Sequence, residues 1–244
     1  MANSWFQFKQ FIIHQEKCAM KVTTDACLFG AFVSQQIQGL KPEVEKILDI
    51  GCGTGLLSLM VTQKNLGSLI DAIEIDKDAF VQASENVTAS PWTDKLNMIH
   101  ADARTYDFPN KYDVIISNPP FYEKELKGAD SKKNIAHHNE GLLLPDLFDI
   151  IKDNLNLTGI FYLLLPFKRN EEIKKILSDS YFSIVQLLLV RQSVNHDYFR
   201  IIIAGVFKAA RPVETRIEEI AIKDENGNYT RPFKNLLSHY YLHL

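Results

Sequence analysis

Seven runs of strand-forming residues, most of them separated by helical patterns, constrain the fold more than any other feature of the sequence. Most runs are apolar on both faces, which is typical of strands in a parallel sheet that helices cover on both sides. A short polar stretch without a helix joins the last two runs, so the final strand is predicted to run antiparallel to the rest. The sequence therefore predicts an α/β protein with a doubly wound, seven-stranded, mostly parallel sheet. The strands are expected at 46–50, 69–75, 96–100, 113–117, 160–165, 184–190 and 200–207, and the helices between them at 55–65, 77–89, 145–155 and 170–179.

No repeat, proline-rich linker or charge block divides the 244 residues, so one domain is predicted over 1–244. Thr24 or Asp25 is expected to cap a helix near the N-terminus. The predicted parts are an N-terminal extension over 1–45 (a short strand or hairpin at 5–13 and a helix at 24–38), a core over 46–208, and a C-terminal turn and short amphipathic helix over 209–244.

Composition excludes several classes of protein. Hydrophobic residues make up 46% of the chain, which is ordinary globular usage and not that of a disordered or repetitive protein. No apolar run reaches the roughly 20 residues of a membrane helix, and the N-terminus lacks the pattern of a signal peptide. The three cysteines, Cys18, Cys27 and Cys52, have no metal-ligand spacing. We therefore expect a cytoplasmic protein with reduced thiols, without a metal and without a membrane partner.

A glycine-rich loop follows the first core strand. Gly51, Gly53 and Gly55 allow the backbone to turn tightly and to approach a ligand closely. The G-x-G-x-G spacing is neither a dinucleotide fingerprint nor a phosphate-binding P-loop. Asp49 just before the loop would repel a phosphate but suits a cationic ligand such as S-adenosylmethionine. A tight turn without a ligand is the alternative.

Acidic residues end the next two strands, at the sheet edge where doubly wound folds bind ligands. Glu74 is expected to hold a ribose diol, beside Ile75, while Asp76 caps the following helix. Asp102 is expected to accept a hydrogen bond from an adenine amino group, and Ala103 to offer its backbone N–H. A plain turn or helix cap is the alternative for Asp102.

An Asn-Pro-Pro-Phe-Tyr segment follows the fourth core strand. The Asn118 side chain and the Pro119 carbonyl can accept the two hydrogens of a planar amine and stabilise the positive charge that develops on its nitrogen. Phe121 offers a face on which a base can stack, with Tyr122 as a second stacking residue. The alternative is a rigid turn with a buried phenylalanine.

Taken together, ILDIGCGTGLLSL, IEID, ADA and NPPF resemble the motifs of Rossmann-type S-adenosylmethionine-dependent methyltransferases that act on amino groups. The segment CAMKVTTDACLFGAF and the tail YTRPFKNLLSHYYL resemble the bacterial family that methylates adenine-37 of a valine tRNA. This resemblance implies that Thr24 and Asp25 belong to the cofactor site and that the N6 amine of an unpaired adenine in the anticodon arm accepts the methyl group. Ribosomal-RNA guanine, protein-glutamine and DNA adenine methyltransferases are the alternatives, together with a binding module whose site has decayed.

Lysines gather after the Asn-Pro-Pro-Phe segment. Contacts with RNA phosphates are one interpretation of this cluster, and a solvated loop is the other. A second basic set lies further along the chain and is more typical of a solubilising helix surface. The sequence leaves the oligomeric state open. The residues are Lys124, Lys127, Lys132 and Lys133 in the first cluster, and Lys168, Arg169, Lys174 and Lys175 in the second.

Overall fold

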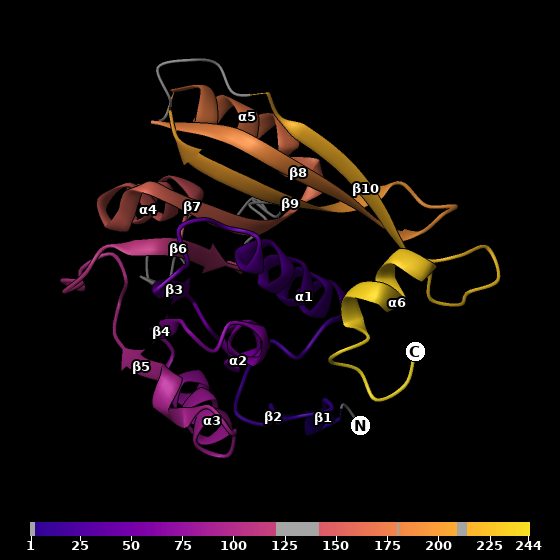
Figure 1. Cartoon of the computed structure of the whole chain (residues 1–244), viewed down its shortest axis with the longest axis horizontal. Coiled ribbons are helices and arrows are strands. Elements are labelled where there is room, and N and C mark those ends of the chain that lie inside the picture. The colour runs from indigo at the N-terminus through magenta and orange to yellow at the C-terminus, as the bar shows by residue number, and fades with distance from the viewer. Residues whose placement is uncertain (1–2, 121–141, 180, 209–213) are drawn as a thin grey trace, which may run out of the picture.

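An eight-stranded sheet forms the centre of the molecule (Figure 1), in the strand order β10-β8-β9-β7-β6-β3-β4-β5. The computed structural model describes residues 3–120, 142–179, 181–208 and 214–244. The strands of this sheet are β3 (Lys46–Ile50), β4 (Leu69–Glu74), β5 (Leu96–His100), β6 (Tyr112–Ser117), β7 (Leu155–Pro166), β8 (Phe182–Ser193), β9 (Tyr198–Phe207) and β10 (Arg216–Lys223).

The predicted α/β fold is confirmed, and all seven predicted strands are present. Strands β3, β4, β5, β6 and β7 all run parallel to one another, and β9 is antiparallel to both of its neighbours, β7 and β8. The eighth strand, β10, pairs in parallel with β8 at the sheet edge. It lies within 209–244, where the sequence predicts only a turn and a helix. An edge strand needs one partner only, and half of the residues of the charged RIEEIAIK segment are exposed, so it lacks the continuous apolar run of the other strands.

Helices cover both faces of the sheet. One face packs against α1 (Thr24–Gln38), α2 (Leu56–Lys64), α3 (Lys77–Thr88) and α6 (Arg231–Leu237), and the other against α4 (Leu144–Asn154) and α5 (Asn170–Asp179). The predicted helix at 24–38 is confirmed, but its cap is Thr23, whose extended backbone lets its side chain accept from the Ala26 N–H at 3.4 Å. Of the helices in the described ranges, none is long and apolar enough to cross a bilayer.

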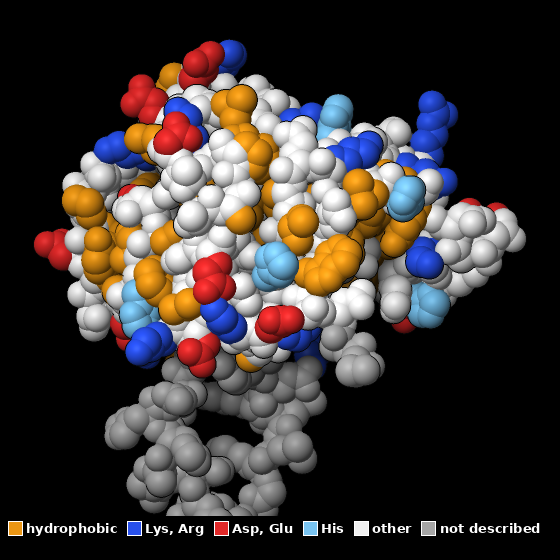
Figure 2. Space-filling model, turned by 90° about the horizontal axis from the view of Figure 1, so that it is seen from below, with side chains coloured by type: hydrophobic (Ala, Val, Ile, Leu, Met, Phe, Trp, Pro, Cys, Tyr) orange, Lys and Arg blue, Asp and Glu red, His pale blue; other side chains and the backbone are white. Residues whose placement is uncertain are grey.

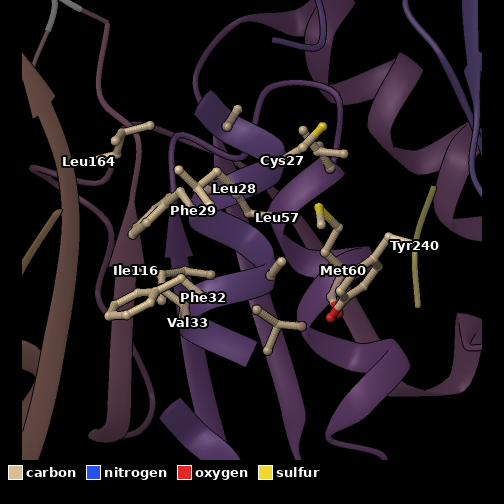
Figure 3. Close-up of a cluster of buried hydrophobic side chains, with 14 of the residues drawn as sticks. Cys27, Leu28, Phe29, Phe32, Val33, Leu57, Met60, Ile116, Leu164 and Tyr240 are labelled. Atoms are coloured by element: carbon tan, nitrogen blue, oxygen red, sulfur yellow. The ribbon is translucent and has the colours of Figure 1, made fainter. Parts of the chain in front are cut away.

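Buried side chains pack α1 against the sheet and against α2 (Figure 3). Phe29 and Phe32 of α1 pack with Ile116 of β6 in one buried cluster. Gly30 permits the close approach of α2, because a Cβ at this position would lie 2.8 Å from the Met60 sulfur. This packing holds α1 rigidly against the sheet.

The two ends of the chain lie side by side (Figure 1). As predicted, the N-terminal extension forms a hairpin, from β1 (Trp5–Gln7) and β2 (Ile12–His14). The Lys9 N–H donates to the Tyr240 carbonyl at 2.8 Å, and the Tyr240 hydroxyl donates to the Met60 carbonyl of α2 at 3.0 Å. The C-terminal segment thereby ties the hairpin to the helices beside the sheet.

Candidate functional site

The candidate site lies at the carboxyl edge of the sheet, where β3 has β4 on one side and β6 on the other. The chain order reverses at this point, and doubly wound sheets bind their ligands there. The Ser117 hydroxyl at the end of β6 donates to the Ile50 carbonyl at the end of β3, at 2.8 Å. This bond fixes the two strand ends, and therefore the loops that follow them, relative to each other.

The glycine loop after β3 has the predicted tight turn. Gly51, Gly53 and Gly55 have φ angles of 71°, 56° and 79°, in the left-handed region that other residues rarely adopt. Gly55 is the N-cap residue of α2, and it has no side chain with which to cap the helix. The side chains of Cys52 and Thr54, between the glycines, are buried. A side chain at the three glycine positions would be strained.

Glu74 at the end of β4 holds this loop. Its side chain is buried, and one carboxylate oxygen accepts from the Gly53 N–H at 2.9 Å while the other accepts from the Asp76 N–H at 2.9 Å. Asp76 accepts from the Ala79 N–H at 2.8 Å, which confirms its predicted role as the cap of α3. Ile75 between them is 60% exposed, an apolar surface beside the loop.

Asp49 brings a buried carboxylate under the loop. Its Oδ2 accepts from the Ser58 hydroxyl of α2 at 2.6 Å, whereas its Oδ1 has no hydrogen-bond partner among the described residues. Burial raises the pKa of Asp49 to about 7, and the nearby Glu74 carboxylate acts in the same direction. A buried acceptor without a partner is costly, so this oxygen suits a ligand that donates to it.

Asn118 follows β6 and carries a second acceptor of the same kind. Its Oδ1 is buried and has no partner within the described part of the chain, and Pro119 after it is also buried. Side chains alternate along a strand, so Asn118 lies on the same face as Ile116, beneath α1. Asp49 lies on this face too, since it contacts α2. Two buried oxygens without a partner in the described part of the chain therefore lie near the carboxyl ends of neighbouring strands, on one side of the sheet.

Asp102, after β5, is engaged with its neighbour Arg104. The Arg104 Nη2 lies 2.6 Å from Asp102 Oδ2, and the Arg104 side chain and backbone N–H both donate to the carboxylate. These hydrogen bonds lower the pKa of Asp102. Asp102 keeps the geometry of a turn residue, and Ala103 beside it is half-buried.

Asp25, in the first turn of α1, pairs with a residue that the sequence does not single out. Its Oδ2 accepts from the Arg200 Nε at 2.7 Å, and Arg200 lies opposite Pro166 at the carboxyl end of β7. The pair ties the N-terminus of α1, including Thr24, to this edge of the sheet. The two partners are 175 residues apart in sequence, so no local sequence pattern predicts this contact.

Asn86 of α3 is a second residue that sequence reasoning missed. Only 1% exposed, it donates from Nδ2 to the His14 carbonyl at 2.8 Å and to the Thr54 carbonyl at 2.9 Å. Its Oδ1 accepts from the His14 N–H at 2.9 Å. One buried amide thus joins the N-terminal hairpin to the glycine loop. An asparagine near a helix end is too common a signal to predict this.

Several predicted residues lie outside the described ranges, namely Phe121, Tyr122, Lys124, Lys127, Lys132 and Lys133. Within those ranges, no group of three or more His, Cys, Asp or Glu side chains is arranged to hold a metal ion. The three cysteines are buried free thiols, and burial raises the pKa of Cys18 to about 11 and of Cys27 to about 12.

Known proteins share this fold. A chain from Agrobacterium tumefaciens, described as a predicted O-methyltransferase, superposes with a TM-score of 0.67 at 15% identity, over 88% of this chain and 96% of that one. A putative class I S-adenosylmethionine-dependent methyltransferase from Listeria monocytogenes has a TM-score of 0.62 at 16% identity, over 85% and 67% of the two chains. At these identities the likeness is one of fold.

Sequence similarity is closer. The family model described as "Methyltransferase small domain" matches residues 33–151. Two curated relatives named tRNA1(Val) (adenine(37)-N6)-methyltransferase are each 37% identical to this chain. The one from Dyadobacter fermentans covers 98% of both chains, and the one from Bacteroides thetaiotaomicron covers 100% of both. The chain is an S-adenosylmethionine-dependent methyltransferase, and it belongs to the tRNA1(Val) (adenine(37)-N6)-methyltransferase family.

Proposed function

We propose that this protein transfers a methyl group from S-adenosylmethionine to the exocyclic N6 amine of adenine 37 in valine tRNA. The chemical part of this proposal rests on the buried Oδ1 of Asn118, which has no hydrogen-bond partner among the described residues. It is an acceptor at the carboxyl edge, on the sheet face that also bears Asp49, where an amine would receive a methyl group from a ligand of the glycine loop. The names of the near full-length relatives support the choice of adenine and of tRNA.

When bound, S-adenosylmethionine supplies an electrophilic methyl group on a positively charged sulfur. We assign the ribose hydroxyls to Glu74 and the cationic amino group to the Asp49 carboxylate, whose Oδ1 lacks a partner among the described residues. The adenine amino group is assigned to Asp102. The remaining residues of the proposed cofactor site are Thr24, Asp25, Gly51, Gly53, Gly55, Ile75 and Ala103.

Asn118 and Pro119 act on the accepting amine. The lone pair of an aromatic amine is delocalised into the ring, so the nitrogen is a poor nucleophile. Two acceptors that hold its hydrogens favour the tetrahedral, positively charged nitrogen of the transition state over the planar ground state. The nitrogen held by these acceptors would receive the methyl group that the cofactor supplies, leaving a neutral thioether behind, and would then lose one N6 proton to water. We assign stacking of the adenine ring to Phe121, with Tyr122 as a second stacking residue.

Cofactor affinity should depend on pH through Asp49. Its pKa is about 7, so the carboxylate that pairs with a cationic amino group becomes more populated as the pH rises through neutrality. Calorimetric titration with S-adenosylmethionine should show affinity increasing between about pH 5.5 and 7, before an α-amino group with a pKa of about 7.7–8.0 loses much of its own charge. The Asp49→Asn variant should bind more weakly and lose this dependence. An unchanged pH profile in that variant would remove Asp49 from the site.

The proposed partner is the anticodon arm, in the cytoplasm. Lys124, Lys127, Lys132 and Lys133 are assigned to its phosphates. Figure 2 shows the side of the molecule where α3 and the N-terminal hairpin lie, and basic and acidic side chains are mixed across it. A local contact through a few lysines fits the net charge of −3, and it implies a log–log salt slope of only a few units.

The proposed substrate is tested with unmodified total RNA and S-adenosylmethionine carrying a labelled methyl group. We expect label in tRNA, recovered as N6-methyladenosine after digestion. Recovery of N2-methylguanosine would instead support a ribosomal-RNA guanine methyltransferase, and label in added protein would support a glutamine methyltransferase. Absence of label from all three would contradict an RNA substrate.

A further inference from the structure

A row of two aromatic rings and a guanidinium group lies near the carboxyl edge of the sheet, at the end of β8, at the start of β9 and on the 3-10 helix η2 (Phe167–Arg169) that follows β7. The rings of Phe167 and Tyr198 have centroids 5.1 Å apart at an interplanar angle of 52°. The Arg191 guanidinium lies over the Tyr198 ring, with its Cζ 3.9 Å from the centroid. Two segments distant in sequence thus form one continuous row, which we call the aromatic row (Phe167, Tyr198, Arg191).

A hydrogen bond and an ion pair hold Arg191 of the aromatic row in place. The Arg191 Nη1 donates to the His196 carbonyl across the turn at 2.9 Å. Glu219 of β10 lies 3.8 Å from the Arg191 Nη2, and its carboxylate raises the pKa of the nearby Tyr198 phenol. The edge strand that the sequence does not predict therefore supplies a carboxylate beside both side chains.

Sheet register places the aromatic row level with the Asn118 segment. Ser117 of β6 pairs with Leu163 of β7, and Pro166 of β7 pairs with Arg200 of β9. Pro120, three positions beyond Ser117, is therefore level with Arg200 near the start of β9, which is two strands away from β6. Neighbouring strands are about 4.8 Å apart, so the start of β9 lies about 10 Å to the side of this segment. An RNA whose adenine lies at Asn118 would bring its adjacent nucleotides to this region.

The chemistry of the aromatic row fits an unpaired nucleobase. RNA-binding proteins hold unstacked bases on aromatic rings and on guanidinium planes. The row is accessible, since the Arg191 side chain is 29% exposed and both rings are only half-buried. The Arg191 guanidinium lies 3.8 Å from the Glu219 carboxylate, and the Arg169 guanidinium of η2 lies 2.8 Å from the Glu172 carboxylate. Because both guanidinium groups are paired, stacking and not phosphate attraction would provide most of the binding energy.

We propose that the aromatic row binds a nucleotide adjacent to the target adenine and so holds the anticodon loop open around that base. This inference rests on the proposed function for the identity of the RNA. It assigns a substrate-binding surface to the β8–β9 turn and to η2, in addition to the lysines that follow the Asn-Pro-Pro-Phe segment.

The test compares two tyrosines of the same kind. Tyr198→Leu removes the central ring of the row, whereas Tyr181→Leu removes an exposed tyrosine that also carries a cation, Lys152, 4.6 Å from its ring centroid. Tyr181 directly precedes β8 and so lies at the opposite edge of the sheet. We expect Tyr198→Leu to raise the KM for tRNA about tenfold or more, the effect of losing one stacked base. Tyr181→Leu should leave it unchanged.

Three further readouts separate binding from folding and stacking from charge. Affinity for S-adenosylmethionine should be equal in both variants, Tyr198→Phe should regain most of the lost tRNA affinity, and the loss in Tyr198→Leu should persist at raised salt. Equal KM values for tRNA in the two leucine variants would overturn the proposal. If the unaltered protein failed to methylate tRNA, the proposed function itself would be wrong, which is a different outcome.

A measurement on the unaltered protein avoids any effect of substitution. Valine tRNA that carries a photoreactive 4-thiouridine beside the target adenine should crosslink, on irradiation, to peptides that contain Phe167 or Tyr198. Crosslinks confined to other segments of the chain would contradict the proposal.

Discussion

Replacing Asn118 by alanine should lower the rate of methyl transfer by about two orders of magnitude or more, in line with the loss of one preorganised charge-stabilising group. S-adenosylmethionine should bind as before. The hydrogen bonds that hold the glycine loop run from the Gly53 and Asp76 N–H groups to Glu74, and the Asn118 side chain takes no part in them. The fold should be retained as well, since the buried Oδ1 of Asn118 has no partner to lose among the described residues. Single-turnover kinetics at saturating cofactor measure the transfer step directly.

A matched control for this variant is Asn156→Ala. The Asn156 Nδ2 donates to the Asp113 Oδ1 at 2.6 Å near the start of β6 and β7, at the opposite edge of the sheet. This variant should lose some thermal stability and keep the transfer rate. If Asn118→Ala instead transferred methyl groups at nearly the unaltered rate, the Asn-Pro-Pro-Phe segment would be a structural turn only.

Replacing Glu74 by alanine should weaken S-adenosylmethionine binding by about tenfold to a hundredfold. A hydrogen bond to a charged acceptor contributes about 1.5–3 kcal/mol, and each 1.4 kcal/mol is about a factor of ten in affinity. The variant also frees the Gly53 N–H, which Glu74 holds at 2.9 Å, so the glycine loop loses an anchor together with the proposed ribose contact. Calorimetric titration gives the dissociation constant without requiring RNA.

Glu85→Ala serves as the control for Glu74→Ala. Glu85 is on α3 and forms an exposed ion pair with Lys17, which contributes little to stability. Its removal should leave cofactor affinity unchanged. Glu74→Gln should fall between the two, because it keeps an acceptor oxygen but not the charge. Unchanged affinity in Glu74→Ala would exclude this carboxylate from the cofactor site.

Local patterns predicted the parts of the site that depend on neighbouring residues. The positive φ angles of Gly51, Gly53 and Gly55 follow from a tight strand-to-helix turn that only glycine adopts without strain. The cap formed by Asp76 follows from its position before an amphipathic helix. Strands buried on both faces were equally visible, because their apolar runs contrast with the polar segments between them.

Contacts between distant segments were not predictable in this way. Arg200 reaches Asp25 across 175 residues, and Asn86 reaches His14 across 72. In strand β10 the alternation of apolar and polar residues is weak, and several residues are charged. An edge strand is less covered by the rest of the protein than a central strand, so it can carry such residues. The cap of α1 is Thr23, one or two residues before the predicted Thr24 or Asp25. Neighbouring Thr and Asp side chains can all accept a bond from a helix N–H, so the sequence alone does not fix which of them is the cap.

Methylation of a single defined nucleotide tests the central claim most directly. Unmodified valine tRNA transcripts with adenine or with guanine at position 37 are incubated with the protein and S-adenosylmethionine, then digested and analysed by mass spectrometry. We predict one N6-methyladenosine, in the fragment that contains position 37 of the adenine transcript, and no methylation of the guanine transcript. Equal methylation of both transcripts, or a methyl group at another position, would contradict the account.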